Sequence, residues 1–315
     1  MKLPKLKLGK LMAKIPIIQG GMAVKVSTAP LAAAVASEGG IGLIAGTGMS
    51  KDELRDEIRK AREMSEGIIG VNIMVAVEKF KELLQTSIKE KVDLIVAGAG
   101  FSRDIFSMTK ENGIEFLPIV SSLKLAKISE RLGATGVIVE GKEAGGHLGT
   151  DRPLKELIKK ISGKINIPVI AAGGIINGND IGEIMELGAD GVQMGSRFVL
   201  SKECEVDDKF KNHYLQSQKE ENVLIKSPVG LPGRIIKNQF SERLDQDKVK
   251  TGETCDFLCL KKCSREFCIM KALENARSGN MKEGLVFAGE RAYLIEKIKT
   301  VKDIINDLIK EVKEY

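Results

Sequence analysis

Short apolar runs recur along the first two thirds of the chain, and each ends in glycine or a polar residue. They are rich in Ile, Val, Leu and Ala and do not alternate with polar positions, which is typical of strands buried on both faces of a parallel sheet. These runs predict strands at residues 15–19, 41–45, 68–73, 94–97, 116–120, 136–140, 169–172 and 191–194.

Segments with apolar residues at helical spacing separate these runs. Ser50 followed by Glu53, for example, is a capping-box pair that predicts the start of one helix. Helices are predicted at residues 30–37, 50–64, 78–89, 103–111, 121–132, 154–161 and 180–190. Strands and helices that alternate up to an eighth strand are the signature of an α/β protein with a (β/α)8 TIM barrel rather than an open sheet.

The pattern changes after residue 200. Residues 200–250 are predicted to begin as a helix and to continue through a connection at 227–233. Residues 254–279 are predicted to be mostly helical, and residues 301–313 to form an amphipathic closing helix. We therefore divide the chain into a barrel at residues 1–200 and a C-terminal, mostly helical extension at residues 201–315. We expect the extension to flank the barrel mouth as a lid, with the last helix packing back on the barrel.

Small residues follow the last two predicted strands. Gly173 and Gly174 come after the seventh strand, and Gly195 and Ser196 after the eighth. In a (β/α)8 barrel the loops after these two strands form the usual phosphate site, because free backbone N–H groups can approach the ligand there. The sequence therefore predicts a phosphate cradle, with two ordinary tight turns as the alternative.

Composition narrows the function classes. Hydrophobic residues make up 43% of the chain and charged residues 29%, with a net charge of +6, which is ordinary for a globular protein. Aromatic residues are only 4% and no basic stripe is interleaved with them, so nucleic-acid binding is not expected. No apolar run reaches the roughly 18 residues of a membrane span, and the N-terminus lacks the apolar core of a signal peptide. We expect a cytoplasmic protein without a membrane partner.

One of the two histidines is a candidate catalytic residue. His147 follows Gly145 and Gly146 in the loop after the sixth strand, where an imidazole can act as a general base or hydrogen-bond donor, or can simply anchor the turn. His213 lies in a polar stretch and is interpreted as a surface residue. No metal-binding trio, nucleophile elbow or Walker loop is present, so a cofactor is expected to carry the chemistry. A flat phosphorylated cofactor such as FMN suits the glycine-rich strand ends.

Five segments in order resemble the nitronate monooxygenase family, formerly called 2-nitropropane dioxygenase, which includes the flavin-type enoyl-ACP reductases. They are residues 19–22 (QGGM), 70–73 (GVNI), 140–147 (EGKEAGGH), 167–174 (IPVIAAGG) and 188–198 (GADGVQMGSRF). The resemblance spans roughly residues 10–240 and implies a TIM barrel that binds FMN non-covalently.

The resemblance also implies roles for single residues. His147 would be the catalytic histidine, and the flavin site would comprise Gly21 and Met22 at the ring, Asn72 and Glu140 as hydrogen-bond partners, Gln193 close by, and Gly146, Gly173, Gly174, Gly195 and Ser196 at the phosphate or ring edge. A small-molecule substrate and a homodimer are further expectations from the family.

The resemblance implies two possible reactions at the same flavin-binding site. A nitronate monooxygenase oxidises alkyl nitronates or nitroalkanes with O2, whereas the reductase branch uses NAD(P)H to reduce an enoyl thioester. Residues 226–234 (KSPVGLPGR) lack the glycine-histidine pair that precedes proline in the enoyl reductases, which favours the monooxygenase. A non-redox barrel that binds a phosphorylated metabolite and a flavin-binding redox sensor remain as further hypotheses.

Four cysteines crowd into a short C-terminal segment, at Cys255, Cys259, Cys263 and Cys268. Thiolates at this density can bind Zn2+ or an iron–sulfur cluster. The usual C-x2-C pairs are missing, however, and a continuous helix cannot easily wrap four ligands around one metal. We therefore predict no metal there and interpret these residues as packed or redox-sensitive thiols.

Overall fold

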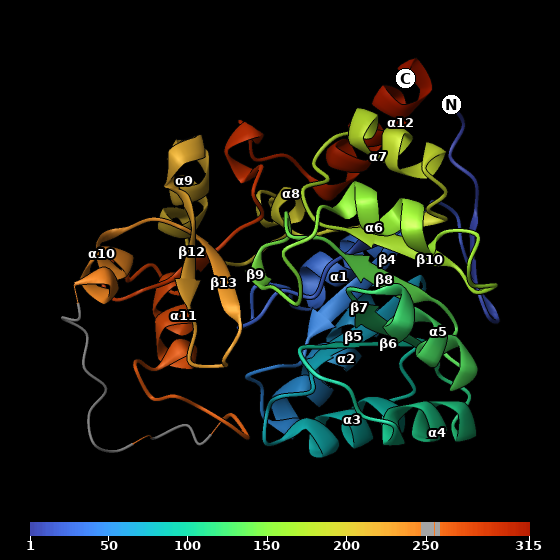
Figure 1. Cartoon of the computed structure of the whole chain (residues 1–315), viewed down its shortest axis with the longest axis horizontal. Helices are drawn as coiled ribbons and strands as arrows, with labels where there is room; N and C mark the ends of the chain where they lie inside the picture. The colour runs from blue at the N-terminus through green and yellow to red at the C-terminus, as the bar shows by residue number, and fades with distance from the viewer. Residues whose placement is uncertain (247–254, 256–258) are drawn as a thin grey trace.

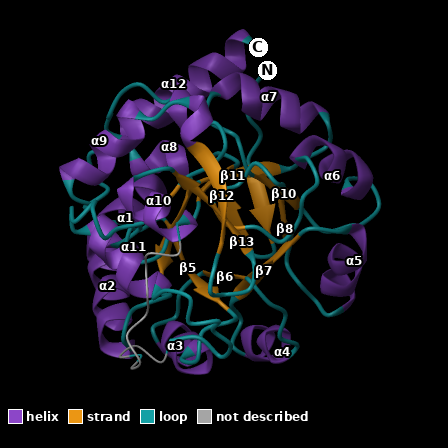
Figure 2. Ribbon diagram, turned by 60° about the vertical axis from the view of Figure 1, so that its left-hand side comes forward, coloured by secondary structure: helices purple, strands orange, loops and turns teal. Residues whose placement is uncertain are grey.

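The predicted strands close into a barrel. The computed structural model describes residues 1–246, 255 and 259–315. Its parallel strands follow the closed order β10-β11-β3-β4-β5-β6-β7-β8. Their bounds are β3 (Ile17–Gln19), β4 (Ile41–Ala45), β5 (Ile68–Met74), β6 (Leu94–Gly98), β7 (Glu115–Val120), β8 (Val137–Glu140), β10 (Val169–Ala172) and β11 (Gly191–Met194). The (β/α)8 barrel fold is confirmed, and Figure 2 shows its strands inside a ring of helices.

Three of the helices around the barrel, α2, α5 and α7, begin at a residue whose side chain caps the first turn. The Ser50 hydroxyl accepts a hydrogen bond from Glu53 N at the start of α2, and Asn177 caps α7 in the same way. Buried apolar stripes on these helices then pack against the β-branched outer faces of the strands. The helices are α1 (Ala29–Ser37), α2 (Lys51–Met64), α3 (Phe80–Lys89), α4 (Asp104–Glu111), α5 (Leu123–Arg131), α6 (Leu154–Ile161), α7 (Gly178–Glu186) and the short α8 (Ser196–Val199).

The end of the barrel opposite the strands' carboxyl ends is closed by an N-terminal hairpin. Its strands β1 (Leu6–Leu8) and β2 (Leu11–Ala13) pair antiparallel. Leu6 and Leu8 are buried in the same core as Ile18 and Ile41 from the barrel strands. With this end filled, the open mouth at the carboxyl ends of the strands is the place for a site.

The C-terminal extension contains a sheet that the sequence analysis missed. The helix predicted from residue 200 is limited to α9 (Asp208–Gln216), and the predicted connection at 227–233 includes the turn of a hairpin between β12 (Asn222–Lys226) and β13 (Pro232–Ile236). The hairpin is followed by α10 (Gln239–Asp245). β13 also pairs with β14 (Val286–Phe287) and with β9 (Gly146–His147) from the barrel loop. The β-branched residues of both arms and Gly230, with a φ of 85°, are the hairpin signals that a helical interpretation overlooked.

The segment from Cys259 to Ser264 crosses between the barrel and the hairpin rather than forming the predicted helix. Cys259 O accepts from Glu78 N at 2.9 Å, Lys261 N donates to Ala76 O at 3.0 Å, and Ser264 N donates to Pro228 O at 3.0 Å. These bonds use the backbone groups that a helix would need for itself. In the described residues of 254–279 the helix is confined to α11 (Ile269–Arg277). Residues 254 and 256–258 of that predicted helix lie outside the described residues.

The closing helix α12 (Val301–Glu314) packs against α7, close to both termini (Figure 1). Glu311 accepts a hydrogen bond from Gly178 N at the start of α7. In Figure 1 the hairpin, α9, α10 and α11 lie together beside the barrel. The domain boundary at residue 200 stays a prediction. None of the helices in the described ranges has the length and apolar character needed to cross a bilayer.

Candidate functional site

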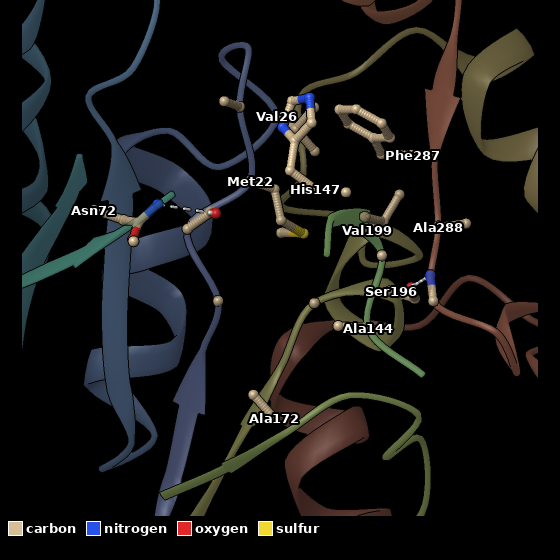
Figure 3. Close-up of a pocket in the computed structure, with 18 of the residues that line it drawn as sticks. Met22, Val26, Asn72, Ala144, His147, Ala172, Ser196, Val199, Phe287 and Ala288 are labelled. Atoms are coloured by element: carbon tan, nitrogen blue, oxygen red, sulfur yellow. Dashed lines mark hydrogen bonds between the residues drawn. The ribbon is translucent and has the colours of Figure 1, made fainter. Parts of the chain in front are cut away.

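A cavity of about 260 Å3 opens at the carboxyl ends of the barrel strands. Every candidate residue named above except the cysteines lines it: Gly21, Met22, Asn72, Glu140, Gly146, His147, Gly173, Gly174, Gln193, Gly195 and Ser196. In Figure 3, Asn72 and Ser196 lie on opposite sides of this pocket, and His147 lies next to Phe287. The roles given to these residues stay predictions, but the fold brings them to one place.

Small residues and the guanidinium of Arg291 surround the end of the pocket next to the carboxyl ends of β10 and β11. Gly173 and Gly174 have φ values of 116° and 70°, which side-chain-bearing residues rarely adopt. The Ser196 hydroxyl accepts from Gly289 N at 2.9 Å. Arg291 donates to Gly174 O at 3.1 Å and to Asp180 Oδ1 at 2.6 Å. The guanidinium, paired with Asp180, and the backbone amides of the Gly173–Gly174 turn and of the start of α8 make this end suitable for an anion.

In the middle of the pocket, the backbone after β3 packs closely against Asn72 on β5. Asn72 Nδ2 donates to Gly21 O at 3.4 Å, and a Cβ on Gly21 would lie only 2.2 Å from Asn72 Cβ. Gln193 Oε1 is buried and has no hydrogen-bond partner in the described part of the chain. An orphaned buried amide oxygen is costly, so this geometry fits a ligand that supplies a donor at that point.

His147 is held by the extension rather than by the barrel. It lies on β9, opposite Gly233 of β13. Its Nε2 lies 2.8 Å from Ser227 Oγ, and the Phe287 ring packs against it edge-on at 5.0 Å. Burial lowers the pKa of His147 to about 4, so the imidazole is neutral near pH 7. A neutral imidazole has one N–H and one lone pair for a substrate or a neighbour.

Glu140 at the end of β8 is also uncharged near neutral pH. Burial raises the pKa of this carboxyl group to about 8. The unfolded chain releases this proton near the ordinary carboxyl pKa of 4.5, whereas the folded chain holds it to about pH 8. Folding stability attributable to Glu140 is therefore complete below pH 4.5 and is lost as the pH rises towards and through 8.

Glu140→Gln should remove this pH dependence. In flavin-free protein we expect wild type and variant to unfold at similar temperatures at pH 5, and the variant to be more stable at pH 9 by on the order of 4 kcal/mol. His147 titrates in both proteins, so the difference between their unfolding curves isolates Glu140. A difference that does not change between pH 5 and pH 9 would show that the carboxyl group is not desolvated.

Apolar side chains cover the His147 end of the pocket. They come from α11, the hairpin turn, the crossing segment and the residue before β14: Val229, Leu260, Ile269, Met270, Leu273 and Leu285. Among the described residues that line the cavity, Arg291 is the only Arg or Lys, and it lies at the opposite, glycine-rich end. The His147 end is therefore an apolar, uncharged chamber.

The cysteines do not assemble into a metal site in the described part of the chain. No group of three or more His, Cys, Asp or Glu side chains there is placed to hold a metal ion. Cys263 is exposed, and Cys255, Cys259 and Cys268 are half-buried free thiols. Burial, followed by the charge of the Cys268 thiolate, raises the pKa of Cys259 to about 11, which makes it a poor nucleophile.

Comparison with known proteins places the chain in a family. The family model described as nitronate monooxygenase matches residues 5–311. The chain belongs to the nitronate monooxygenase family. A probable nitronate monooxygenase of Staphylococcus saprophyticus is 31% identical over 292 residues, which cover 78% of this chain and 82% of the relative.

Other members of this similarity group carry different names. (3aS,4S,5R,7aS)-5-hydroxy-7a-methyl-1-oxo-octahydro-1H-indene-4-carboxyl-CoA dehydrogenase of Mycobacterium tuberculosis is 32% identical over 240 residues, covering 75% of this chain and 67% of the relative. The structure of FabK from Thermotoga maritima superposes with a TM-score of 0.87 at 36% identity, covering 96% of this chain and 94% of that one. The family is thus one of oxidoreductases with more than one substrate.

Several pocket residues were not found from the sequence. Met270, Phe287 and Arg291 line the cavity, and Ser227 lies behind the lining in contact with His147. All four come from the extension, which reaches the mouth through the β9–β13 pairing. Their contacts are long-range, and no local motif marks them. His213, interpreted as a surface residue, is instead half-buried on α9, outside the pocket lining.

Proposed function

We propose that the pocket binds FMN non-covalently and that the protein is an FMN-dependent oxidoreductase. The observation that supports this proposal is that one cavity combines a glycine-rich end containing Arg291 with an unsatisfied Gln193 oxygen. The amides around Gly174 and Ser196, together with Arg291, would hold the phosphate. Asn72 and Gln193 would contact the ring system. Bound FMN would supply two-electron transfer, for which no described side chain is suited.

On the substrate side the pocket favours an uncharged acyl thioester. His147 and Glu140 are both neutral near pH 7, and the chamber beside them is apolar. An anionic nitronate would lose its hydration there without gaining a positive partner, which is unfavourable. A neutral acyl chain would instead gain burial against Leu260, Met270 and Leu273. The carboxyl-CoA dehydrogenase relative, whose name specifies a thioester, supports the same class.

In this reaction the chain's own residues orient and polarise the substrate. His147 would donate a hydrogen bond to the thioester carbonyl oxygen, where negative charge develops as the double bond is reduced. The residues of α11 and the crossing segment would hold the acyl chain and exclude water. NAD(P)H is the proposed source of electrons, so an α,β-unsaturated thioester, NAD(P)H and a proton from solvent would give the saturated thioester and NAD(P)+.

Nitronate oxidation is the second candidate. The family model and the 31% identical staphylococcal relative favour it, as does the segment at residues 226–234. A neutral His147 could take the α-proton from a neutral nitroalkane. Family membership fits both candidate functions. The uncharged substrate end of the pocket distinguishes them, because it favours a neutral thioester over an anionic nitronate.

Parallel assays with one preparation distinguish these functions. FMN-reconstituted protein would be supplied anaerobically with NADPH and crotonyl-CoA, and separately in air with ethyl nitronate or nitroethane. Thioester-dependent consumption of NADPH supports the proposed function. Oxygen consumption with the nitro compounds alone would move the assignment to the monooxygenase. A chain that takes up no flavin would leave the non-redox phosphate-binding barrel.

A further inference from the structure

The hydroxyl of Ser227 is buried next to His147, which lines the pocket. Ser227 lies directly after β12, is 1% exposed, and begins a turn in which Gly230 N donates to Ser227 O at 2.9 Å. That turn is tied to the crossing segment by the bond from Ser264 N to Pro228 O. The β9–β13 pairing fixes His147 beside it. The two side chains therefore meet through backbone that is anchored on both sides.

The neighbours of this hydroxyl determine which group accepts its proton. Two are described: Val229 N donates to Ser227 Oγ at 3.4 Å, and His147 Nε2 lies 2.8 Å from the same oxygen. Val229 N–H occupies one lone pair. A hydroxyl shielded from solvent must still place its own proton on an acceptor, and among the described groups the imidazole nitrogen is the acceptor within reach.

From this we infer that Ser227 donates its proton to Nε2 of His147 and thereby fixes the tautomer in which Nδ1 carries the hydrogen. Nδ1 has no partner in the described structure, is not among the buried unpaired atoms, and belongs to a ring that lines the pocket. The Nδ1–H group is thus the one offered to a ligand. Phe287 holds the ring plane by its edge-on contact.

The tautomer has a chemical consequence. With Nδ1–H facing the pocket, His147 is a hydrogen-bond donor to a carbonyl or nitro oxygen and has no lone pair available to remove an α-proton. Ser227 is accordingly a positioning residue that acts through His147. The consequence for substrate choice rests on the proposed function, whereas the tautomer itself is a property of the protein without substrate.

Nitrogen NMR of histidine-labelled protein tests the assignment directly, because the chain has only two histidines. In a His213→Gln background a single imidazole remains. We expect its Nδ1 to show the protonated, pyrrole-type signal and its Nε2 the pyridine-type signal from pH 6 to 9. Protonation at Nε2 would overturn the inference, because Ser227 would then be the acceptor.

Variants at Ser227 separate positioning from packing. Ser227→Ala should shift the tautomer towards Nε2–H and lower kcat for the thioester by about 10-fold, comparable with the loss of one hydrogen bond of about 1.4 kcal/mol, with a smaller change in KM. Ser227→Thr retains the hydroxyl and should restore both readouts. Ser217→Ala removes another buried hydroxyl of the extension, which bonds to Tyr214 O at 2.8 Å, and should leave the tautomer unchanged.

Different results would contradict the positioning role of Ser227 and the proposed function. An unchanged tautomer in Ser227→Ala would overturn the positioning role of Ser227, whatever the substrate proves to be. The expected tautomer without any thioester turnover would leave that role intact and remove the proposed function instead.

Discussion

His147→Ala is expected to lower kcat for thioester reduction by about 100- to 10,000-fold, the usual range for a positioned proton donor or acceptor. The variant loses the imidazole N–H proposed to contact the thioester carbonyl, and His147 is the one histidine among the described residues that line the cavity. FMN binding should change little, because the anion-binding end at Gly174, Ser196 and Arg291 lies elsewhere. Steady-state kinetics on preparations matched for flavin content measures this effect.

His213→Gln is the matched control for His147→Ala. It removes the other imidazole of the chain from α9, outside the pocket, and should leave kcat within about twofold of wild type, as expected for a substitution away from the site. If His147→Ala turns over as fast as this control, His147 takes no part in the chemistry and the proposed role of the β9 loop is wrong.

Gly21→Ala is expected to weaken FMN binding by about 10- to 100-fold, since overpacking costs about 1–3 kcal/mol. The new Cβ would lie 2.2 Å from Asn72 Cβ and 2.8 Å from Asn72 Cγ, so the β3 loop and Asn72 would have to move apart at the predicted ring position. Quenching of flavin fluorescence during titration of the apoprotein gives the dissociation constant.

The neighbouring glycine provides the control for Gly21→Ala. The atoms nearest to a Cβ on Gly20 would be Gln193 Cγ and Met194 O at 3.5 Å and Gln193 Cδ at 3.7 Å, which are ordinary contacts. Gly20→Ala should therefore keep the Tm of wild type, whereas Gly21→Ala should lower it. Equal FMN affinity in Gly21→Ala and wild type would mean that the ring system does not lie against the Gly21–Asn72 contact.

The sequence predicted the barrel because its signals are local. A run such as residues 169–172 is buried on both faces wherever it lies, and the small residues after it must come to the mouth with those of the other strands. That is why Gly173, Gly195 and His147 could be placed in one site before their contacts were known. The resemblance to a flavin family then assigned the roles that geometry alone did not.

The extension was less predictable because its structure depends on distant partners. Residues 222–226 read equally well as part of a helix until β13 is paired beside them, and β13 in turn pairs with β14 from some fifty residues later. Ser227 has no motif that would link it to His147, eighty residues earlier. Residues of this kind complete the pocket in three dimensions without leaving a pattern in the sequence.

The central claim is that the glycine-rich end of the pocket binds the phosphate of FMN, and a comparison of two flavins tests it most directly. Apoprotein would be titrated with FMN and, separately, with riboflavin, which has the same ring and ribityl chain without the phosphate. Charge-assisted hydrogen bonds contribute about 1.5–3 kcal/mol each, so FMN should bind at least about 100-fold more tightly. Equal affinity for the two flavins, or binding of neither, would contradict the account.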